Sequence, residues 1–171
     1  MDRIDVIIKE LKSRNYQSFD TFYNLTKNQV FYAIISIIKD QSLAEDLMQD
    51  TYVKFLEKID QYKDGSNIYA YLSTIGRNLA INLYNQRKKE VYSEELLETI
   101  PYEEEQKTDD SQIFKILDLL EKDEREIVVL HVINELKFRE ISEITSKPLG
   151  TVLWIYNKAI KKLKEKAGDV L

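Results

Sequence analysis

Cysteine is absent from this 171-residue chain, and histidine occurs only once, at His131. Without cysteine there is neither a disulfide framework nor a thiolate metal site, and one imidazole cannot build a histidine cluster. We therefore expect no metal and no other cofactor. An enzyme is the weakest interpretation, because His131 lies among apolar residues, where a packing role is more common than that of a general base.

Glycine and proline are also scarce, with four and two copies. Few β-hairpin signals remain, and 43% apolar residues can build one or two small helical cores, so the sequence predicts an all-α fold. The first residues lack a long hydrophobic run, because charges interrupt Ile4, Ile7, Ile8 and Leu11. That pattern argues against a signal peptide or a membrane span. We expect a cytoplasmic protein with no membrane insertion.

An overall excess of positive charge is lacking too, since the net charge is −5. Residues 1–89 nonetheless hold 13 basic and 11 acidic side chains, and residues 113–171 hold 11 and 10. The deficit lies at residues 90–112, where nine acids face Lys107 alone. Such a segment repels itself and has little to bury, so we expect a flexible acidic linker. The sequence thus predicts two mildly basic domains, 1–89 and 113–171, joined by that linker.

Apolar residues at helical spacing predict the helices of the N-terminal domain. One stripe begins at Phe19, and a second, from Val30 to Ile38, is apolar on nearly all sides and should be central. Asp40 or Ser42 can cap a third helix. A fourth helix is expected from about Ile68 to Lys89, with an inward stripe of Leu72, Ile75, Leu79 and Leu83.

The stretch from Leu136 to Lys166 has the pattern of a helix-turn-helix. Its first helix is predicted from Phe138 to about Thr145, and Pro148 interrupts it by disfavouring helical geometry at Lys147. A second helix should start beside Pro148, which the first turn of a helix tolerates. Its inward face is predicted to hold Val152, Ile155 or Tyr156, Ala159 and Leu163, and its outward face Leu153, Trp154, Asn157, Lys158 and Lys161.

Three segments, taken in order, resemble one family: the extracytoplasmic-function (ECF) sigma factors, small two-domain promoter-recognition subunits of bacterial RNA polymerase in the sigma-70 family. Residues 44–50, AEDLMQD, are similar to the AEDLxQ signature of sigma region 2. Residues 71–89, YLSTIGRNLAINLYNQRKK, resemble the helix that melts the promoter and reads its −10 element. GTV at 150–152, after FREISEI, resembles the helix-turn-helix of region 4. The order, the acidic linker and the length make the match specific from about Phe19 to Lys166.

The third predicted helix carries a polar ridge of Asp46, Gln49 and Asp50, whose spacings of three and four place them on one face. Taken alone, such a ridge is an ordinary solvated helix surface. The resemblance implies that it docks on the coiled coil of the largest subunit of core RNA polymerase. Acids and an amide suit a basic partner helix, giving complementarity and steering.

The fourth predicted helix carries Asn78, Asn82 and Asn85 at spacings of four and three. Amides on one face can bind base edges or line a pocket for an unstacked base. The resemblance places an Asn at position 78 and uses the preceding loop, 63–67, to hold a flipped −10 base; Asn82 and Asn85 depart from its usual Asp and Arg. The predicted −10 DNA-binding residues are Asn67, Arg77, Asn78, Asn82, Asn85, Arg87 and Lys88. The three cations of this set can contact phosphates.

The resemblance assigns the last helix to the promoter's −35 element, read as duplex in the major groove. The predicted −35 DNA-binding residues are Arg139, Thr151, Leu153, Trp154, Asn157, Lys158 and Lys161. The family's usual Lys-Ser-Arg after GTV is here Leu153-Trp154-Ile155, which removes two cations from the base-reading surface. Leu153 and Trp154 can meet thymine methyl groups in an AT-rich element, or they can form a protein interface.

The leading hypothesis is therefore a sigma factor that directs promoter-specific transcription initiation. Its implied partners are promoter DNA, core polymerase through the largest-subunit coiled coil and the flap, and an anti-sigma factor. One alternative is a sigma-like regulatory module that binds polymerase or an anti-sigma partner but reads DNA weakly. A conventional dimeric repressor or activator would share the helix-turn-helix, but it would leave AEDLMQD unexplained.

Overall fold

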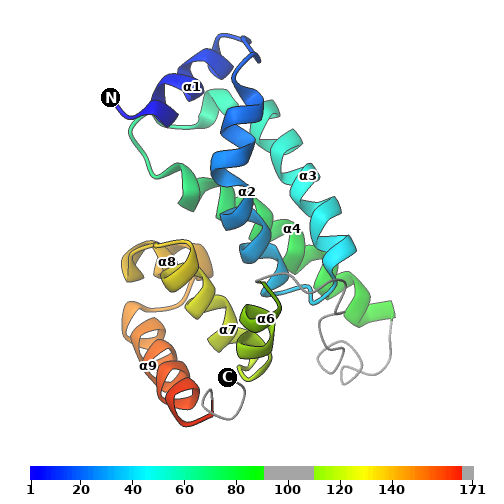
Figure 1. The fold of residues 1–171 in the computed structure, drawn as a ribbon, viewed down its shortest axis with the longest axis vertical. Helices are drawn as coiled ribbons and strands as arrows, with labels where there is room; N and C mark the ends of the chain where they lie inside the picture. The colour runs from blue at the N-terminus through cyan, green and yellow to red at the C-terminus, as the bar shows by residue number, and fades with distance from the viewer. Residues whose placement is uncertain (91–109, 167–171) are drawn as a thin grey trace.

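The computed structural model describes residues 1–90 and 110–166, and every regular element within these ranges is helical (Figure 1). Residues 91–109, which include most of the expected acidic linker, lie outside the described residues. The N-terminal elements are α1 (Arg3–Lys12), α2 (Phe19–Ile35), α3 (Gln41–Glu57), the short 3₁₀ helix η1 (Ile59–Gln61) and α4 (Ile68–Glu90). The C-terminal elements are α6 (Asp110–Asp118), α7 (Lys122–Val128), the π-helical turn η2 (Val129–Ile133), α8 (Phe138–Thr145) and α9 (Leu149–Lys166).

Helix α2 is the centre of the N-terminal domain. The two apolar stripes that begin at Phe19 and Val30 both start in this one helix, which ends at Ile35, and Phe22, Val30 and Ile34 are fully buried. Phe22 stacks on Phe55 of α3 with ring centroids 5.1 Å apart. Of the two candidate caps for α3, Asp40 serves, because its Oδ1 accepts a hydrogen bond of 3.0 Å from the backbone N–H of Leu43.

The buried face of α4 differs from the predicted inward stripe. Leu72 is fully buried as expected, but Ile75, Leu79 and Leu83 are only partly buried, and the deeply buried positions are Ser73, Gly76, Ala80 and Tyr84. The physical reason is close helix packing: a Cβ at Gly76 would lie 3.1 Å from Cγ1 of Ile34. Small residues let α4 approach α2 and α3 closely, and the larger aliphatic side chains flank that contact line.

The helix-turn-helix forms where the sequence predicts it. Helix α8 ends at Thr145, and Ser146 adopts the left-handed conformation, with a φ of 56°. Helix α9 begins directly after Pro148, whose carbonyl accepts a 3.0 Å hydrogen bond from the N–H of Val152. Val152, Ile155 and Ala159 are buried, whereas Tyr156 and Leu163 are partly buried. The predicted inward face of this helix is confirmed.

The two domains pack directly against each other, an arrangement that we call closed. The π-helical turn η2 packs against α2, and α8 packs against α4, whereas α9 lies on the far side of the C-terminal domain (Figure 1). The buried Arg125 donates from Nε to the carbonyl of Ser36 over 2.7 Å, and the buried Asn134 donates from Nδ2 to the carbonyl of Gln29 and to Oγ of Ser73, each over 3.0 Å. Buried polar groups are costly unless they are paired, so these contacts define a specific interface.

Candidate protein and nucleic-acid interfaces

The three predicted polymerase-binding residues form one exposed surface, the α3 ridge, consisting of Asp46, Gln49 and Asp50. The opposite face of α3 buries Ala44, Leu47, Met48, Thr51, Tyr52 and Phe55, which fixes the direction in which the ridge points. None of the three ridge side chains forms a hydrogen bond or ion pair with another residue in the described ranges 1–90 and 110–166. The ridge is therefore open to a partner in the closed arrangement.

A cavity of about 590 Å³ lies at the boundary of the two domains. We call it the α4 cavity. Its N-terminal wall comprises Ser66, Asn67, Ala70, Tyr71, Thr74, Arg77 and Asn78. Its C-terminal wall comprises Glu140, Glu143, Ile144 and Ser146. The structure thus brings together three predicted −10 residues, from the loop before α4 and from α4 itself, around one hollow that has hydrogen-bonding groups on one side and acids on the other.

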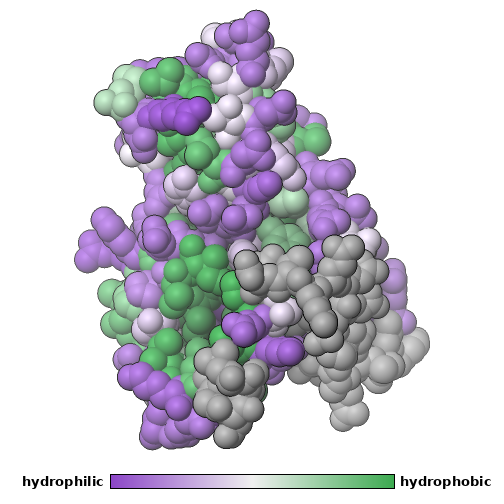
Figure 2. Space-filling model, viewed as in Figure 1, coloured by the Kyte–Doolittle hydropathy of each residue, from purple (hydrophilic) through white to green (hydrophobic). Residues whose placement is uncertain are grey.

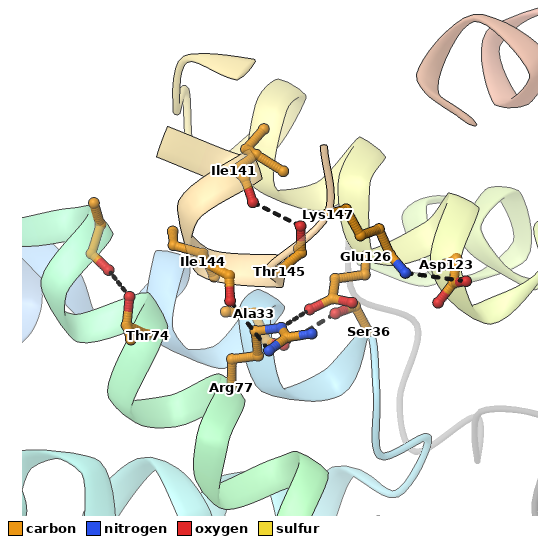
Figure 3. Close-up of polar contacts among 11 residues, drawn as sticks. Ala33, Ser36, Thr74, Arg77, Asp123, Glu126, Ile141, Ile144, Thr145 and Lys147 are labelled. Atoms are coloured by element: carbon orange, nitrogen blue, oxygen red, sulfur yellow. Dashed lines mark hydrogen bonds and ion pairs between the residues drawn. The ribbon is translucent and has the colours of Figure 1, made fainter. Parts of the chain in front are cut away.

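Arg77 at this cavity is engaged by the C-terminal domain (Figure 3). Its Nε donates to Oε1 of Glu126, and its Nη1 donates to the carbonyl of Ile144 over 3.2 Å. The Glu126 side chain is only 3% exposed and that of Arg77 is 14% exposed, so the ion pair is buried. Arg77 cannot contact a phosphate while this pair persists.

Asn67 is held in the same way. Its Oδ1 accepts hydrogen bonds from the backbone N–H groups of Tyr69 and Ala70, which caps the start of α4. Its Nδ2 donates to Oε1 of Glu140 over 3.2 Å. Both ends of this amide are therefore occupied in the closed arrangement, and one of its partners belongs to the other domain.

The remaining predicted −10 residues lie farther along α4 and do not line the cavity. Asn82 and Asn85 are exposed, and Arg87 is half-buried. Nζ of Lys88 lies 5.9 Å from the centroid of the Tyr84 ring. With Lys89, the two cations form the basic last turn of α4.

The predicted −35 residues are all exposed on the helix-turn-helix: Arg139 on α8, and Thr151, Leu153, Trp154, Asn157, Lys158 and Lys161 on α9. Trp154 is 63% exposed. Nζ of Lys158 lies 5.3 Å from the centroid of the Trp154 ring and 3.6 Å from Oε1 of Glu124. Figure 2 shows hydrophobic side chains gathered over the C-terminal helices on the viewed face.

Glu124 of α7 links α7 to α9 through ion pairs with Lys158 and Lys162. This buried carboxylate forms a 2.7 Å ion pair with Lys162, and it accepts the backbone N–H of Glu121 over 3.1 Å. Burial disfavours the charged form, but the hydrogen bonds from Lys162 and Glu121 and the nearby charge of Lys158 outweigh it and hold the pKa of Glu124 below its usual value. Two lysines of α9 are therefore directed partly toward the protein.

His131 has a packing environment. Its ring stacks on Phe138 with centroids 4.0 Å apart and meets the edge of Tyr156 at 4.9 Å, while Nδ1 lies 2.9 Å from the carbonyl oxygen of Leu136. In the described part of the chain, no group of three or more His, Asp or Glu residues is placed to hold a metal ion. No helix there is long and apolar enough to cross a membrane.

Sequence reasoning missed the residues through which the domains contact each other. Glu126 and Glu140 face Arg77 and Asn67 across separations of 49 and 73 residues, and Asn134 faces Ser73 across 61. A single sequence holds no signal for pairs this distant, because helical periodicity reports only which face of a helix is polar. The one local hint was Glu126, an acid directly before the largely apolar run 127–133. A carboxylate next to buried residues is usually paired with a cation.

Comparisons with known proteins agree with this geometry. The family model for sigma-70 region 2 matches residues 22–90, and that for sigma-70, region 4 matches residues 111–166. The ECF RNA polymerase sigma factor SigM of Bacillus subtilis is 28% identical over 153 residues, covering 86% of this chain and 93% of that protein. The ECF RNA polymerase sigma factor EcfG of Rhodopseudomonas palustris is 30% identical over 133 residues, covering 75% of this chain and 74% of that protein.

Solved structures show the same fold. The sigma factor RpoE of Bartonella quintana, in complex with the anti-sigma factor NepR, is 27% identical with a TM-score of 0.70, covering 87% of this chain and 96% of that one. CnrH, in complex with the cytosolic domain of CnrY, has a TM-score of 0.70 at 19% identity, covering 98% of this chain and 99% of that one. By its two matched regions, its relatives and its all-helical two-domain fold, the chain belongs to the ECF sigma factors of the sigma-70 family.

Proposed function

We propose that this chain is a sigma factor that binds core RNA polymerase, brings it to a two-part promoter and helps to open the −10 region, while catalysing no reaction itself. The observation that supports the proposal is that the chain has three separate surfaces of different chemistry. One domain presents the free α3 ridge together with the amide-lined α4 cavity, and the other presents a helix-turn-helix. Because its proposed target is RNA polymerase, we infer that it acts in the cytoplasm.

The α3 ridge is the proposed contact with the polymerase. Asp46 and Asp50 are exposed acids without a partner in the described residues, and Gln49 between them offers both a donor and an acceptor. A basic helix of the largest subunit would satisfy all three. Such a contact favours rapid, charge-steered association, which salt should weaken.

The α4 cavity is the proposed receptor for an unstacked base of the opened −10 strand. Asn67 and Asn78 supply amides at its wall, Thr74 supplies a hydroxyl, and Tyr71 supplies an aromatic ring. The basic end of α4 continues the path with cations suited to phosphates. Single-strand capture needs this combination of a pocket and a cationic track.

The closed arrangement must open before that strand can bind. Glu140 and Glu143 line the cavity, and Glu126 holds Arg77, so a DNA phosphate would meet acids where it needs cations. Like charges at short range repel each other. Separating the domains removes the acids and frees Arg77, and it also lets the helix-turn-helix move to a duplex element farther along the DNA.

The exposed Leu153 and Trp154 support a second candidate, in which this face of α9 binds a protein. The solved relative from Bartonella quintana is in complex with an anti-sigma factor, which supports an anti-sigma partner for this chain as well. In that case the chain would be a module that binds polymerase or its inhibitor and reads DNA weakly.

Run-off transcription with core polymerase on a library of random promoters tests the proposal. The native chain should select templates that share two elements, and the double variant Asp46→Lys/Asp50→Lys should produce no run-off. Polymerase binding without any selected template would instead support the weak-reading module. A chain that neither binds core polymerase nor yields transcripts would overturn the proposal.

A further inference from the structure

Helix α1 has no role in the surfaces described so far, and it precedes the region 2 match, which starts at residue 22. Ile4, Ile7, Ile8 and Leu11 anchor it by burial against the N-terminal core. Its last residue, Lys12, extends toward the loop between η1 and α4, some 50 residues later in the chain. That loop forms part of the α4 cavity wall through Ser66 and Asn67.

Lys12 contacts this loop at two points. Its Nζ donates to the carbonyl of Tyr62 over 2.7 Å and forms an ion pair with Oδ1 of Asp64, also over 2.7 Å. The same ammonium lies 5.6 Å from the centroid of the Tyr62 ring. The Lys12 side chain is 23% exposed, so its hydrogen bond to the carbonyl of Tyr62 is partly shielded from water. Asp64 is 58% exposed, so solvent screens the ion pair, and the bond to Tyr62 is the stronger of the two contacts.

Hydrogen bonds within the loop connect the residues that Lys12 contacts to Ser66 at the cavity wall. Lys63 to Ser66 form a turn closed by the Ser66 N–H to Lys63 carbonyl bond of 3.1 Å, with Gly65 at a φ of 83° as a type II turn requires. The Tyr62 hydroxyl donates to the carbonyl of Ser66. Lys12 therefore fixes both Tyr62, directly before the turn, and Asp64 within it. The residue directly after the turn is Asn67, which caps α4.

A second link between the α1 end and the loop region is weaker. Arg14, in the left-handed conformation with a φ of 64°, pairs with Asp60 of η1 over 2.8 Å. Both side chains are more than half exposed, at 52% and 68%, so solvent screens the pair. Lys12 is thus the main polar tie from α1 to the turn among the described residues.

We propose that Lys12 is a positioning residue for −10 strand capture: it fixes the turn at 62–66 so that Ser66 and Asn67 stand at the rim of the α4 cavity, where an unstacked base of single-stranded DNA would enter. The assignment rests on the proposed function of that cavity. It extends the −10 machinery to a helix outside the region 2 match.

The test measures how tightly holoenzyme, assembled from core polymerase and the full chain, binds a single-stranded −10 oligonucleotide taken from a selected promoter. Lys12→Met should weaken this binding about tenfold, as expected for loss of hydrogen bonds to a charged donor. Lys12→Arg, which retains the cation, should restore most of the affinity. Arg3→Met, which removes an exposed cation at the start of the same helix, is the matched control and should bind as the native chain does.

Asp64→Asn separates positioning from simple charge. Removing an acid close to DNA should strengthen binding if only electrostatics matters, whereas loosening the turn should weaken it. This variant also covers the case in which Lys12→Met fails to fold, because Asp64 is an exposed residue of the turn. Core-polymerase affinity should stay unchanged in every variant.

Tight oligonucleotide binding by both Lys12→Met and Asp64→Asn would overturn the positioning role and leave the proposed function intact. Failure of Lys12→Arg to restore binding would also count against it. If the native holoenzyme itself ignores the −10 oligonucleotide, then the proposed function of the cavity fails, and the role of Lys12 fails with it.

Discussion

The α3 ridge and the N-terminal wall of the α4 cavity belong to the same domain, yet in the closed arrangement the ridge is free and the wall is contacted by the other domain. Asp46, Gln49 and Asp50 are exposed and have no polar partner in the described residues. Arg77 and Asn67 at the cavity are each engaged by a glutamate of the C-terminal domain. The α3 ridge is therefore open to a protein in the closed chain, while Arg77 and Asn67 of the proposed −10 surface are engaged by the other domain. Under the proposed function, this difference favours binding of polymerase before DNA.

The covering contact is specific because it is polar and buried. A buried ion pair contributes little net stability compared with an apolar contact of the same size, but removing one partner strands the other charge at a cost of about 3–5 kcal/mol. The pair of Arg77 and Glu126 has this character, whereas the exposed ridge does not. The two surfaces should therefore respond in different ways to mutation.

The largest effect is expected at the ridge. Asp46→Lys with Asp50→Lys should weaken core-polymerase binding by about 3 kcal/mol or more, roughly 100-fold, because two attractive contacts become repulsive. Pull-down or titration with core polymerase measures this, and circular dichroism checks that the exposed substitutions leave the fold intact. Glu57→Lys, an exposed acid at the other end of α3, is the control. Unchanged affinity in the folded double variant would remove the ridge from the polymerase interface.

Glu126→Ala should have the next largest effect, and only on the covered surface. The variant leaves Arg77 without its carboxylate, so the closed arrangement should lose about 3 kcal/mol or more and the free chain should bind a −10 oligonucleotide more tightly. Small-angle scattering should report a larger radius of gyration. Core-polymerase binding through the ridge should not change. A chain that remains as compact and as weak a DNA binder as the native one would show that Glu126 does not hold the domains together.

Trp154→Ala probes a third surface, which is exposed in the closed arrangement as the ridge is. If Trp154 meets a base, the variant should bind a duplex −35 fragment more weakly by about 1–3 kcal/mol. Replacing thymine by uracil in the fragment should then weaken the native chain and not the variant, because only a methyl group is removed. Val132→Ala, another exposed apolar residue of this domain, is the control. Equal affinity of native and variant chains would favour a protein partner at this position.

The smallest effect concerns pH. The lowered pKa of Glu124 means that its charged contacts with Lys158 and Lys162 stabilise the fold above the unfolded value of 4.5 and are lost as pH falls through the lower folded value. Glu124→Gln should therefore lose about 1 kcal/mol of stability at neutral pH and less in acid. Thermal unfolding between pH 7 and pH 3 measures this. A native and a variant chain with parallel pH profiles would contradict it.

Prediction from sequence succeeded where the signal is local. The bounds of α8, the turn at Pro148, the buried face of α9 and the exposure of the ridge all follow from residues within one or two helical turns of each other. The inward stripe of α4 was misjudged, because hydrophobicity alone favoured Ile75, Leu79 and Leu83 over the small residues around Gly76. Periodicity finds an apolar face but not how closely a neighbour can approach it.

The amino-acid sequence by itself determined the helical elements, the family resemblance and the chemistry of the candidate surfaces, because these depend on short-range spacing and on residue type. Only the tertiary structure decided that Arg77 faces Glu126, that Asn67 faces Glu140 and that Lys12 reaches the turn at 62–66. Each of these pairs joins residues far apart in the chain. Whether a polar side chain is free for a partner or already paired depends on how the helices pack together, and a helix's own sequence does not encode the identity of its neighbour.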